Sequence, residues 1–209
     1  MPRLNWNNRF FASTRGRILT LLRREKRTVD DLASELALTD NAVRAHLATL
    51  ERDGFVRQHG ERRGSGKPAF VYELAPEAEY LFPKSYGQIL NELLQVLDEH
   101  MSREELEEML RSVGRRIASQ WHTPEANLRV RLEAAVEVLN ELGGMAELGD
   151  ENGVYIIRGF SCPLAAVVPG HPEACLLAEA LVTELAGVPV REQCERGERP
   201  CCRFMVTAT

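Results

Sequence analysis

The apolar pattern of the first 75 residues restricts the fold more than any other feature, because three short helical segments are followed at once by two short strands. Ile18, Leu19 and Leu22 recur at helical spacing in the first segment, and Thr28 with Asp31 forms a capping box at the start of the second. The two strands in "FVRQHGERRGSGKPAFVYEL" flank a basic, glycine-rich tip. This order of elements predicts a helix-turn-helix followed by a β-hairpin wing.

The third helical segment is the one that we expect to enter the major groove of DNA. It starts at an N-cap, Thr39 or Asp40, and its outward face carries several short side chains. Asn41 and Arg44 are the predicted base readers, and His46 is predicted to contact phosphate or to pack against the wing. Solvated surface residues are the alternative interpretation. The full predicted DNA-contacting set is Asp40, Asn41, Arg44, Ala45, His46, Thr49, Arg62, Arg63 and Lys67.

Charge is divided unevenly along the chain. Residues 1–75 contain 14 Lys and Arg against 9 Asp and Glu, whereas residues 76–209 contain 12 against 22. A basic part joined to an acidic remainder indicates that only the first part meets a polyanion, although a solvated basic surface has the same composition. Together with the helix-turn-helix pattern, this division predicts a double-stranded DNA operator as the partner.

Neither a membrane span nor a secretory signal is evident in the sequence. No stretch reaches roughly 18 consecutive apolar residues, and "MPRLNWNNRFFAST" lacks the apolar core and cleavage site of a signal peptide. We therefore expect a cytoplasmic protein without a membrane partner and without structural disulfides.

Beyond Pro76 the apolar residues follow the spacing of two longer helices, "SYGQILNELLQVLDEH" and "SREELEEMLRSVGRRIASQW". Ser102 with Glu105 forms a second capping box at the start of the latter. Their apolar stripes need a surface to bury against, and an operator with two half-sites needs a dimer. Residues 76–122 are therefore predicted to be a helical dimerisation linker of a homodimer, with packing inside one chain as the alternative.

The remaining segment, residues 123–209, is predicted to be a small α+β lobe. Thr123 is expected to cap its first helix, with Pro124 at the first helical position, and a hairpin, a second helix and two strands follow. The predicted fold is thus α+β, with a winged helix-turn-helix in 1–75, the helical linker and this lobe. The lobe contains all five cysteines, each at the end of an element: Cys162, Cys175, Cys194, Cys201 and Cys202.

Element ends are places where thiols from separate segments can converge, and soft metal centres require thiolate ligands. The spacing C-x12-C-x18-C-x6-C-C matches neither a zinc ribbon nor a ferredoxin, so it leaves the metal open. Buried or redox-sensitive thiols are the alternative. In the final strand Cys202 shares a face with Phe204 and Val206, which turns it inward if those two are core, although the preceding loop could present Cys201 instead.

The segments "AVRAHLATLERDGFV", "RGSGKPAFVYEL", "LFPKSYGQ" and the late "C…HPEAC…G…C-x-F" together resemble the SufR-type iron–sulfur regulators, relatives of the ArsR- and DeoR-like helix-turn-helix proteins. The resemblance implies a homodimeric cytoplasmic regulator with an iron–sulfur cluster in its C-terminal lobe. Cys162 and Cys175 match the first two ligands of the family's motif. The last ligand is Cys202 if the spacing to Phe204 sets the register, or Cys201 if a preceding glycine does.

One departure from the family's pattern concerns Cys194, which lies close to the final pair and leaves the third ligand open. Four cysteines favour a 4Fe–4S cluster, but a 2Fe–2S cluster, a zinc ion or a three-cysteine site would fit the same residues. His171 and Glu173 are candidate substitute ligands, with a role in starting a helix around Pro172 as the alternative.

The sequence therefore predicts a DNA-binding transcriptional regulator, a repressor, whose operator affinity is controlled by an iron–sulfur cluster. A winged-helix sensor of zinc or of thiol oxidation is the alternative. An enzyme with a cysteine nucleophile and His171 as base has the least support, because no phosphate-binding loop or third orienting group is recognisable. We therefore do not expect an enzyme.

Overall fold

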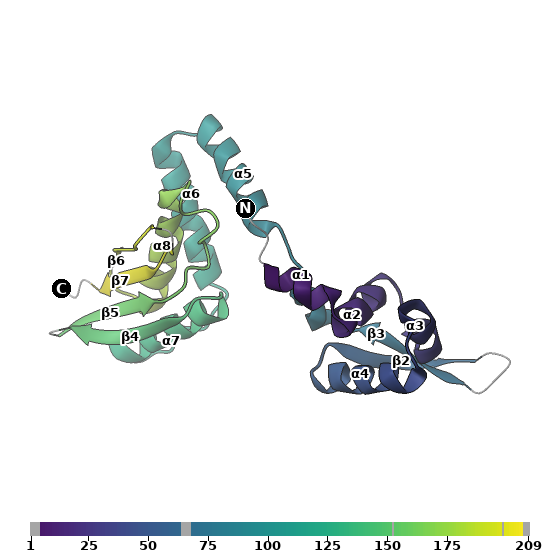
Figure 1. Ribbon diagram of the computed structural model, residues 1–209. Coiled ribbons are helices and arrows are strands. Elements are labelled where there is room, and N and C mark those ends of the chain that lie inside the picture. The colour runs from purple at the N-terminus through teal and green to yellow at the C-terminus, as the bar shows by residue number, and fades with distance from the viewer. Residues whose placement is uncertain (1–4, 64–67, 152, 198, 207–209) are drawn as a thin grey trace. The chain divides into compact units, whose positions relative to one another are not determined.

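The computed structural model describes residues 5–63, 68–151, 153–197 and 199–206. The chain forms two compact units, Met1–Lys84 and Ser85–Thr209, and each combines helices with an antiparallel sheet (Figure 1). The predicted α+β class is confirmed.

The first unit has the order of elements expected for a winged helix-turn-helix. Its three strands form an antiparallel sheet in the order β1-β3-β2, and helices α2, α3 and α4 share one apolar core that includes Ile18, Leu32 and Leu47. The elements are α1 (Asn5–Ala12), α2 (Thr14–Arg24), β1 (Arg27–Thr28), α3 (Val29–Leu36), α4 (Asp40–Arg52), β2 (Val56–Arg62), β3 (Ala69–Leu74) and the 3-10 helix η1 (Pro76–Leu81).

Side-chain caps fix where these helices begin. Thr28 accepts a hydrogen bond from the Asp31 backbone at 3.2 Å, and the Asp31 carboxylate accepts one from the Thr28 backbone at 2.8 Å, so the predicted capping box is confirmed. Of the two candidate caps of α4, Thr39 is the one that accepts a hydrogen bond, from the Ala42 backbone at 3.3 Å. Gly54 follows α4 with a φ of 76°, which favours glycine.

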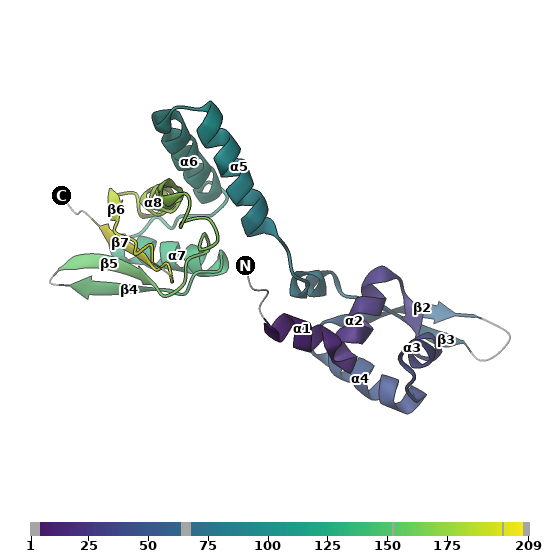
Figure 2. The same cartoon turned by 45° about the horizontal axis from the view of Figure 1, so that its top comes forward.

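The second unit is a four-stranded antiparallel sheet in the order β4-β5-β7-β6, with α7 and α8 packed on one face (Figure 2). Phe204 and Ile157, which face each other across β5 and β7, are fully buried under these helices. The elements are α5 (Tyr86–His100), α6 (Arg103–Ala118), α7 (Leu128–Glu141), β4 (Ala146–Glu151), β5 (Val154–Gly159), η2 (Pro172–Ala174), α8 (Cys175–Ala186), β6 (Val190–Glu192) and β7 (Cys202–Val206).

Helices α6 and α8 approach each other closely at Gly114. A Cβ atom at this position would lie 2.2 Å from the backbone oxygen of Leu177, so only glycine fits there without moving the helices apart. The predicted capping box of Ser102 and Glu105 at the start of α6 is confirmed by both of its hydrogen bonds. Helix α6 therefore has a fixed start and a close contact with the helix that carries Cys175.

The segment from 76 to 122, predicted to be a separate linker, is divided between the two units. Its 3-10 helix η1 lies in the first unit, whereas α5 and α6 lie in the second. None of the described helices combines the length and the apolar character needed to cross a membrane.

The predicted start of α7 at Thr123 and Pro124 is wrong. The helix begins at Leu128, because Asn127 has extended backbone and its side chain accepts a hydrogen bond from the Val130 backbone at 3.1 Å. Thr123 and Asn127 are both residue types that can cap a helix, and Asn127, which is closer to the buried residues of α7, is the actual cap.

Candidate thiol centre and nucleic-acid interface

The outward face of α4 presents the residues that were predicted to read DNA. Asp40, Asn41, Arg44 and Ala45 are exposed, whereas His46 is half-buried. Among the described residues, the side chains of Asn41 and Arg44 make no hydrogen bond or ion pair with one another or with any other group. Either side chain can therefore reach a base without first breaking a hydrogen bond or an ion pair within the protein.

Thr49 differs from these residues, because it is half-buried and its hydroxyl donates a hydrogen bond to the Ala45 backbone oxygen at 3.0 Å. This internal bond occupies the Thr49 hydroxyl proton. A groove contact of Thr49 would therefore use the hydroxyl oxygen as an acceptor.

The wing residues predicted to contact DNA have different environments. The Arg62 guanidinium pairs with Asp31, at 2.8 Å and 2.9 Å from its two carboxylate oxygens, and lies 3.2 Å from the Thr28 hydroxyl. Arg63 is exposed, and Lys67 lies outside the described residues. Arg62 thus joins the wing to the start of α3, and its charge is partly neutralised within the unit.

A buried carboxylate, Glu73 of β3, joins three basic side chains on the sheet. Lys26 Nζ, Arg57 Nε and His59 Nδ1 lie 2.9, 2.7 and 3.1 Å from its oxygens. The hydrogen bond from Lys26, followed by that from Arg57, lowers the pKa of Glu73 to about 2. The Arg62 hydrogen bond lowers the pKa of Asp31 to about 2 in the same way.

Because of these two carboxylates, we expect the first unit to lose stability in acid. Because both pKa values are lowered on folding, their stabilising contribution is complete above pH of about 4.5 and decreases as the pH falls toward 2. Urea unfolding followed by circular dichroism at pH 5.5 and pH 3 should show this loss. Glu73→Gln should lower stability at pH 5.5 and make the difference between the two pH values smaller. Glu61→Gln, at an exposed position of the same wing, should keep the wild-type difference in stability between the two pH values. If both variants show the same pH dependence of stability, Glu73 is not a source of the acid sensitivity.

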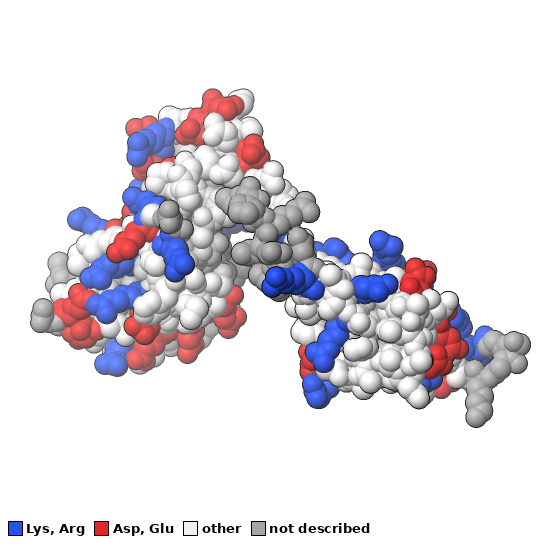
Figure 3. Space-filling model, viewed as in Figure 1, with Lys and Arg blue, Asp and Glu red and all other residues white. Residues whose placement is uncertain are grey.

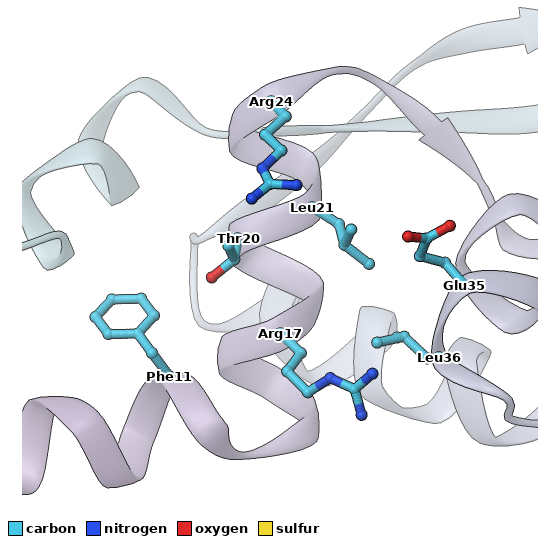
Figure 4. Close-up of a pocket in the computed structure, with 7 residues that line it drawn as sticks. All are labelled: Phe11, Arg17, Thr20, Leu21, Arg24, Glu35 and Leu36. Atoms are coloured by element: carbon cyan, nitrogen blue, oxygen red, sulfur yellow. The ribbon is translucent and has the colours of Figure 1, made fainter.

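One pocket of the first unit lies against α2 and has a volume of about 190 Å³ (Figure 4). The figure shows four lining side chains from α2, one from α1 and two from α3: Arg17, Thr20, Leu21 and Arg24, then Phe11, then Glu35 and Leu36. This lining has a single carboxylate and no thiol. Soft metal ions prefer thiolate ligands, so this pocket has the wrong chemistry for the expected metal centre.

The structure brings four of the five cysteines together in the second unit, each from a different segment. Cys162 follows β5, Cys175 is the first residue of α8, Cys194 follows β6 and Cys202 is the first residue of β7. All five cysteines are free thiols. Because these four positions are far apart in the sequence, it is the packing of α8 on the sheet that makes them converge.

The four thiols line one side of a chamber of about 250 Å³, which we name the thiol chamber. Its other walls are apolar and come from α6, α7, α8 and the loop after β5: Ile117, Leu139, Leu142, Pro163, Leu164, Leu177, Ala178 and Leu181. An apolar lining offers water few hydrogen-bond partners beside the thiols. The chamber therefore combines soft ligands with apolar walls.

Hydrogen bonds among the thiols, together with burial, shift their pKa values. The bond to Cys162 raises the pKa of Cys202 to about 12, and the same bond lowers the pKa of Cys162. The bond to Cys175 lowers the pKa of Cys194, but its bond to Cys202 and burial together raise it to about 12. The bond to Cys194 and burial raise the pKa of Cys175 far above its ordinary value. At neutral pH at least three of these thiols hold their protons, so metal binding must release protons.

Cys201 does not join this group. Alternation along β7 buries Cys202, Phe204 and Val206 on the core face, as predicted, and Cys201 precedes the strand on the opposite side. Its backbone pairs with Glu195, and its thiol lies 3.5 Å from the Arg199 backbone oxygen. The geometry thus favours Cys202 over Cys201 as the predicted fourth ligand.

The other two predicted substitute ligands pair with each other. His171 is buried, and its Nδ1 lies 3.2 Å from a Glu173 carboxylate oxygen. Pro172 occupies the first position of η2, as predicted. His171 and Glu173 therefore fix the turn that leads into α8, and neither lines the thiol chamber.

Sequence reasoning missed two residues that lie beside these thiols without lining the thiol chamber, Glu192 and Arg196. One ligand atom each of Cys175, Glu192 and Cys194 lie within 4.8 Å of one another. The Arg196 guanidinium forms an ion pair with Glu192, and the neighbouring Cys175 thiol raises the pKa of Arg196. The signal that could have found Glu192 is its alternation with Val190 in "VPVRE", which puts both on one face of a strand.

The four thiols have the chemistry that a soft metal centre requires. Their spacing indicates whether that centre is a single ion or something larger. In a tetrahedral zinc site with sulfur ligands at roughly 2.3 Å, all four sulfur atoms would surround one ion closely. Cys162 and Cys202 fall outside the compact group that contains Cys175 and Cys194. All four thiols line the same chamber of about 250 Å³, which has room for a larger centre than one ion.

The distribution of charge distinguishes the surfaces of the two units. On the face drawn in Figure 3, Asp and Glu side chains gather along the lower edge of the second unit, over β4 and α7, with Lys and Arg among them. This agrees with the excess of acidic residues after position 75. The second unit is therefore the less favourable surface for a polyanion.

Two family models match parts of the chain. Residues 12–58 match the model of bacterial regulatory proteins of the arsR family, and residues 74–152 match the model of the D-type subunit of cellulose synthase. The first match contains α2, α3 and α4. The second match crosses from one unit into the other, contains none of the cysteines and covers less than half of the chain, so we draw no functional conclusion from it.

The winged-helix fold and the first match define the class of this protein as a DNA-binding transcriptional regulator. More particularly, residues 12–58, which contain the helix-turn-helix, are similar to the arsR family of bacterial regulatory proteins.

Two solved structures are similar to parts of the chain. The adhesin competence repressor AdcR from Streptococcus pyogenes is 22% identical, over 47% of this chain and 73% of its own, with a TM-score of 0.30. A mutant of ZitR from Lactococcus lactis in its apo form is 20% identical, over 49% and 77%, with a TM-score of 0.28. Scores this low carry no argument about function. Comparison with curated proteins finds no match.

Proposed function

We propose that this protein is a homodimeric transcriptional repressor whose affinity for its operator is set by a 4Fe–4S cluster bound in the thiol chamber. The proposed ligands are Cys162, Cys175, Cys194 and Cys202. The first unit is proposed to bind double-stranded DNA through the outward face of α4 and the wing. The protein is proposed to act in the cytoplasm and to have no enzymatic activity.

A single observation carries this proposal, namely that four thiols from four separate segments face one apolar chamber. A free cysteine can fill a core as a small apolar residue, but that role does not require four thiols to line one chamber. Thiolates are the usual protein ligands of iron–sulfur clusters. The chamber's apolar walls would protect such a centre from water.

Several residues that line the thiol chamber belong to the helices of the second unit. Ile117 of α6 and Leu177 of α8 both form part of its wall, and these helices touch closely at Gly114. A bound cluster would hold the four cysteine-bearing segments together through covalent bonds to sulfur. When the thiols lack that link, the start of α8 is held by weaker contacts, so the packing of α6 against it loosens. A coupling of about 1 to 3 kcal/mol between a site and an operator corresponds to a roughly 5- to 150-fold change in affinity.

Helix α5 supports the proposed dimer. Tyr86, Ile89, Leu93 and Val96 form one stripe along it, and between 52% and 66% of each residue's surface is exposed. Leu94, on the other side of α5, is buried against α6. A stripe that its own unit leaves uncovered fits the second copy that an operator with two half-sites requires.

A zinc-sensing regulator is the second candidate, and the compact group of Cys175, Glu192 and Cys194 favours it. Sulfur and carboxylate oxygen are both zinc ligands, and a single ion fits ligand atoms within 4.8 Å of one another. In that case the two other thiols of the chamber would be spare.

Metal analysis of protein purified without oxygen tests the proposal. The expected result is about four iron and four sulfide per chain, with the visible absorbance of a cluster. Near two iron and two sulfide would identify a 2Fe–2S cluster and overturn the cluster type. One zinc per chain without sulfide would overturn the iron–sulfur proposal in favour of the second candidate.

A further inference from the structure

Strand β6 has a carboxylate on the face that it turns toward the core. Val190 and Glu192 alternate with exposed Arg191, and the register pairs Val190 with Val206 and Glu192 with Phe204. Val206 and Phe204 are both buried. Directly paired residues of an antiparallel sheet lie on the same face, so the Glu192 side chain leaves the sheet on its core side.

Core-facing carboxylates need partners, and Glu192 has partners that fix its position. One carboxylate oxygen accepts a hydrogen bond from the Cys194 backbone at 3.0 Å, and the other forms the ion pair with Arg196. The Glu192 backbone is itself held by the Glu179 carboxylate at 2.8 Å. Partners of this kind orient ligating carboxylates in metal sites.

The same carboxylate lies beside two thiols. Ligand atoms of Glu192, Cys175 and Cys194 are all within 4.8 Å of one another. Two sulfur atoms and one oxygen at this spacing are three of the four ligands of a tetrahedral zinc ion. Neither Cys162 nor Cys202 belongs to this group.

We infer that Glu192 is a metal ligand and that, with Cys175 and Cys194, it forms a site for one zinc ion, with water at the fourth position. Binding breaks the two S–H bonds and releases two protons to the solvent. Two zinc–sulfur bonds and one bond from zinc to the Glu192 carboxylate form, and the hydrated ion keeps one water and releases the others. Arg196 remains beside the site, where its positive charge offsets that of the two thiolates. Compared with the proposed cluster site, the zinc site adds Glu192 as a ligand and omits Cys162 and Cys202.

The zinc ion and the iron–sulfur cluster cannot be bound by the same chain at once, because they share ligands. Cys175 and Cys194 belong to both sets, so a chain that holds zinc at this site cannot complete the four-thiol set, and the reverse is also true. This exclusion rests on the proposed function, whereas the zinc site itself rests only on the geometry around Glu192. Zinc would thereby oppose cluster loading of the same chain.

Zinc titration of the metal-free full chain, in competition with a chromophoric chelator, tests the site. Glu192→Gln should weaken zinc binding at least about tenfold, since even the loss of a partner of a metal ligand typically costs 10- to 100-fold. Glu195→Gln, an exposed neighbour, should bind zinc as the wild type does. Cys162→Ser should also keep wild-type zinc affinity, because Cys162 is outside the set, whereas Cys175→Ser should lose it.

Two results would overturn the zinc site: wild-type zinc affinity in Glu192→Gln, or a loss in Cys162→Ser as large as that in Cys175→Ser. Circular dichroism of each variant without metal separates ligand loss from misfolding, and a misfolded Glu192→Gln would be replaced by Glu192→Asp, which should also weaken zinc binding. If the wild type binds zinc in this pattern but never holds iron and sulfide, the proposed function fails and the zinc site stands. If a cluster forms and Glu192→Gln binds zinc normally, only the zinc site fails.

Discussion

Cys175→Ser is expected to abolish the iron and sulfide content of protein prepared without oxygen. Cys175 is buried at the start of α8 and faces the thiol chamber, so no solvent-exposed group can replace it. A serine hydroxyl is a poor ligand for a soft metal centre. Iron and sulfide analysis together with visible absorbance measures the result, and Cys162→Ser should behave in the same way.

Cys201→Ser is the matched control for this loss, because Cys201 neighbours a proposed ligand but lies away from the chamber. It should keep the full iron and sulfide content, whereas Cys202→Ser should lose it. Retention of the metal in Cys162→Ser or Cys175→Ser would show that these residues are not ligands. Loss in Cys201→Ser with retention in Cys202→Ser would reverse the choice between the two neighbours. Thermal unfolding of each variant checks that the second unit is folded.

Arg44→Ala is expected to have the second large effect, a loss of about 1 to 3 kcal/mol in operator binding with relaxed preference at one base pair. Arg44 is exposed on α4 and makes no hydrogen bond or ion pair with the described residues, so its guanidinium is available to a base edge. The measurement is the affinity for operators selected from random duplexes, repeated with each base pair changed in turn.

Two controls separate base reading from general attraction to DNA. Arg52→Ala removes an arginine at the far end of the same helix, where it pairs with Asp53 at 3.1 Å, and should leave the sequence preference unchanged. Lys67→Ala should weaken binding to all sequences alike and reduce the salt dependence. If Arg44→Ala binds every selected duplex as the wild type does, α4 is not the recognition helix.

Local signals in the sequence were sufficient to predict much of the first unit. The Thr28 and Asp31 capping box and the two strands of the wing each depend on residues close together in the chain. The second capping box, at Ser102, was predictable for the same reason. Alternation along a single strand likewise predicted that Cys202 would be buried with Phe204.

Interactions between distant segments were beyond the reach of these signals. The choice of Asn127 over Thr123 as the cap of α7 depends on what the helix packs against, because both residue types can cap. Arg62 was predicted to contact DNA from its position in a basic wing, and its ion pair with Asp31 joins residues 31 positions apart. Alternation along "VPVRE" could have placed Glu192 on the same face as Val190, but only the folded sheet shows that this face brings it beside Cys175.

The most direct test of the central claim, that the thiol chamber controls DNA binding, is the dissociation constant for one selected operator. It should be measured on a single anaerobic preparation at fixed salt, before and after the cluster is removed with a chelator. We predict a change of roughly 5- to 150-fold, with Cys175→Ser binding like the metal-free wild type before and after the same treatment. Equal dissociation constants for the cluster-containing and metal-free protein would contradict the account.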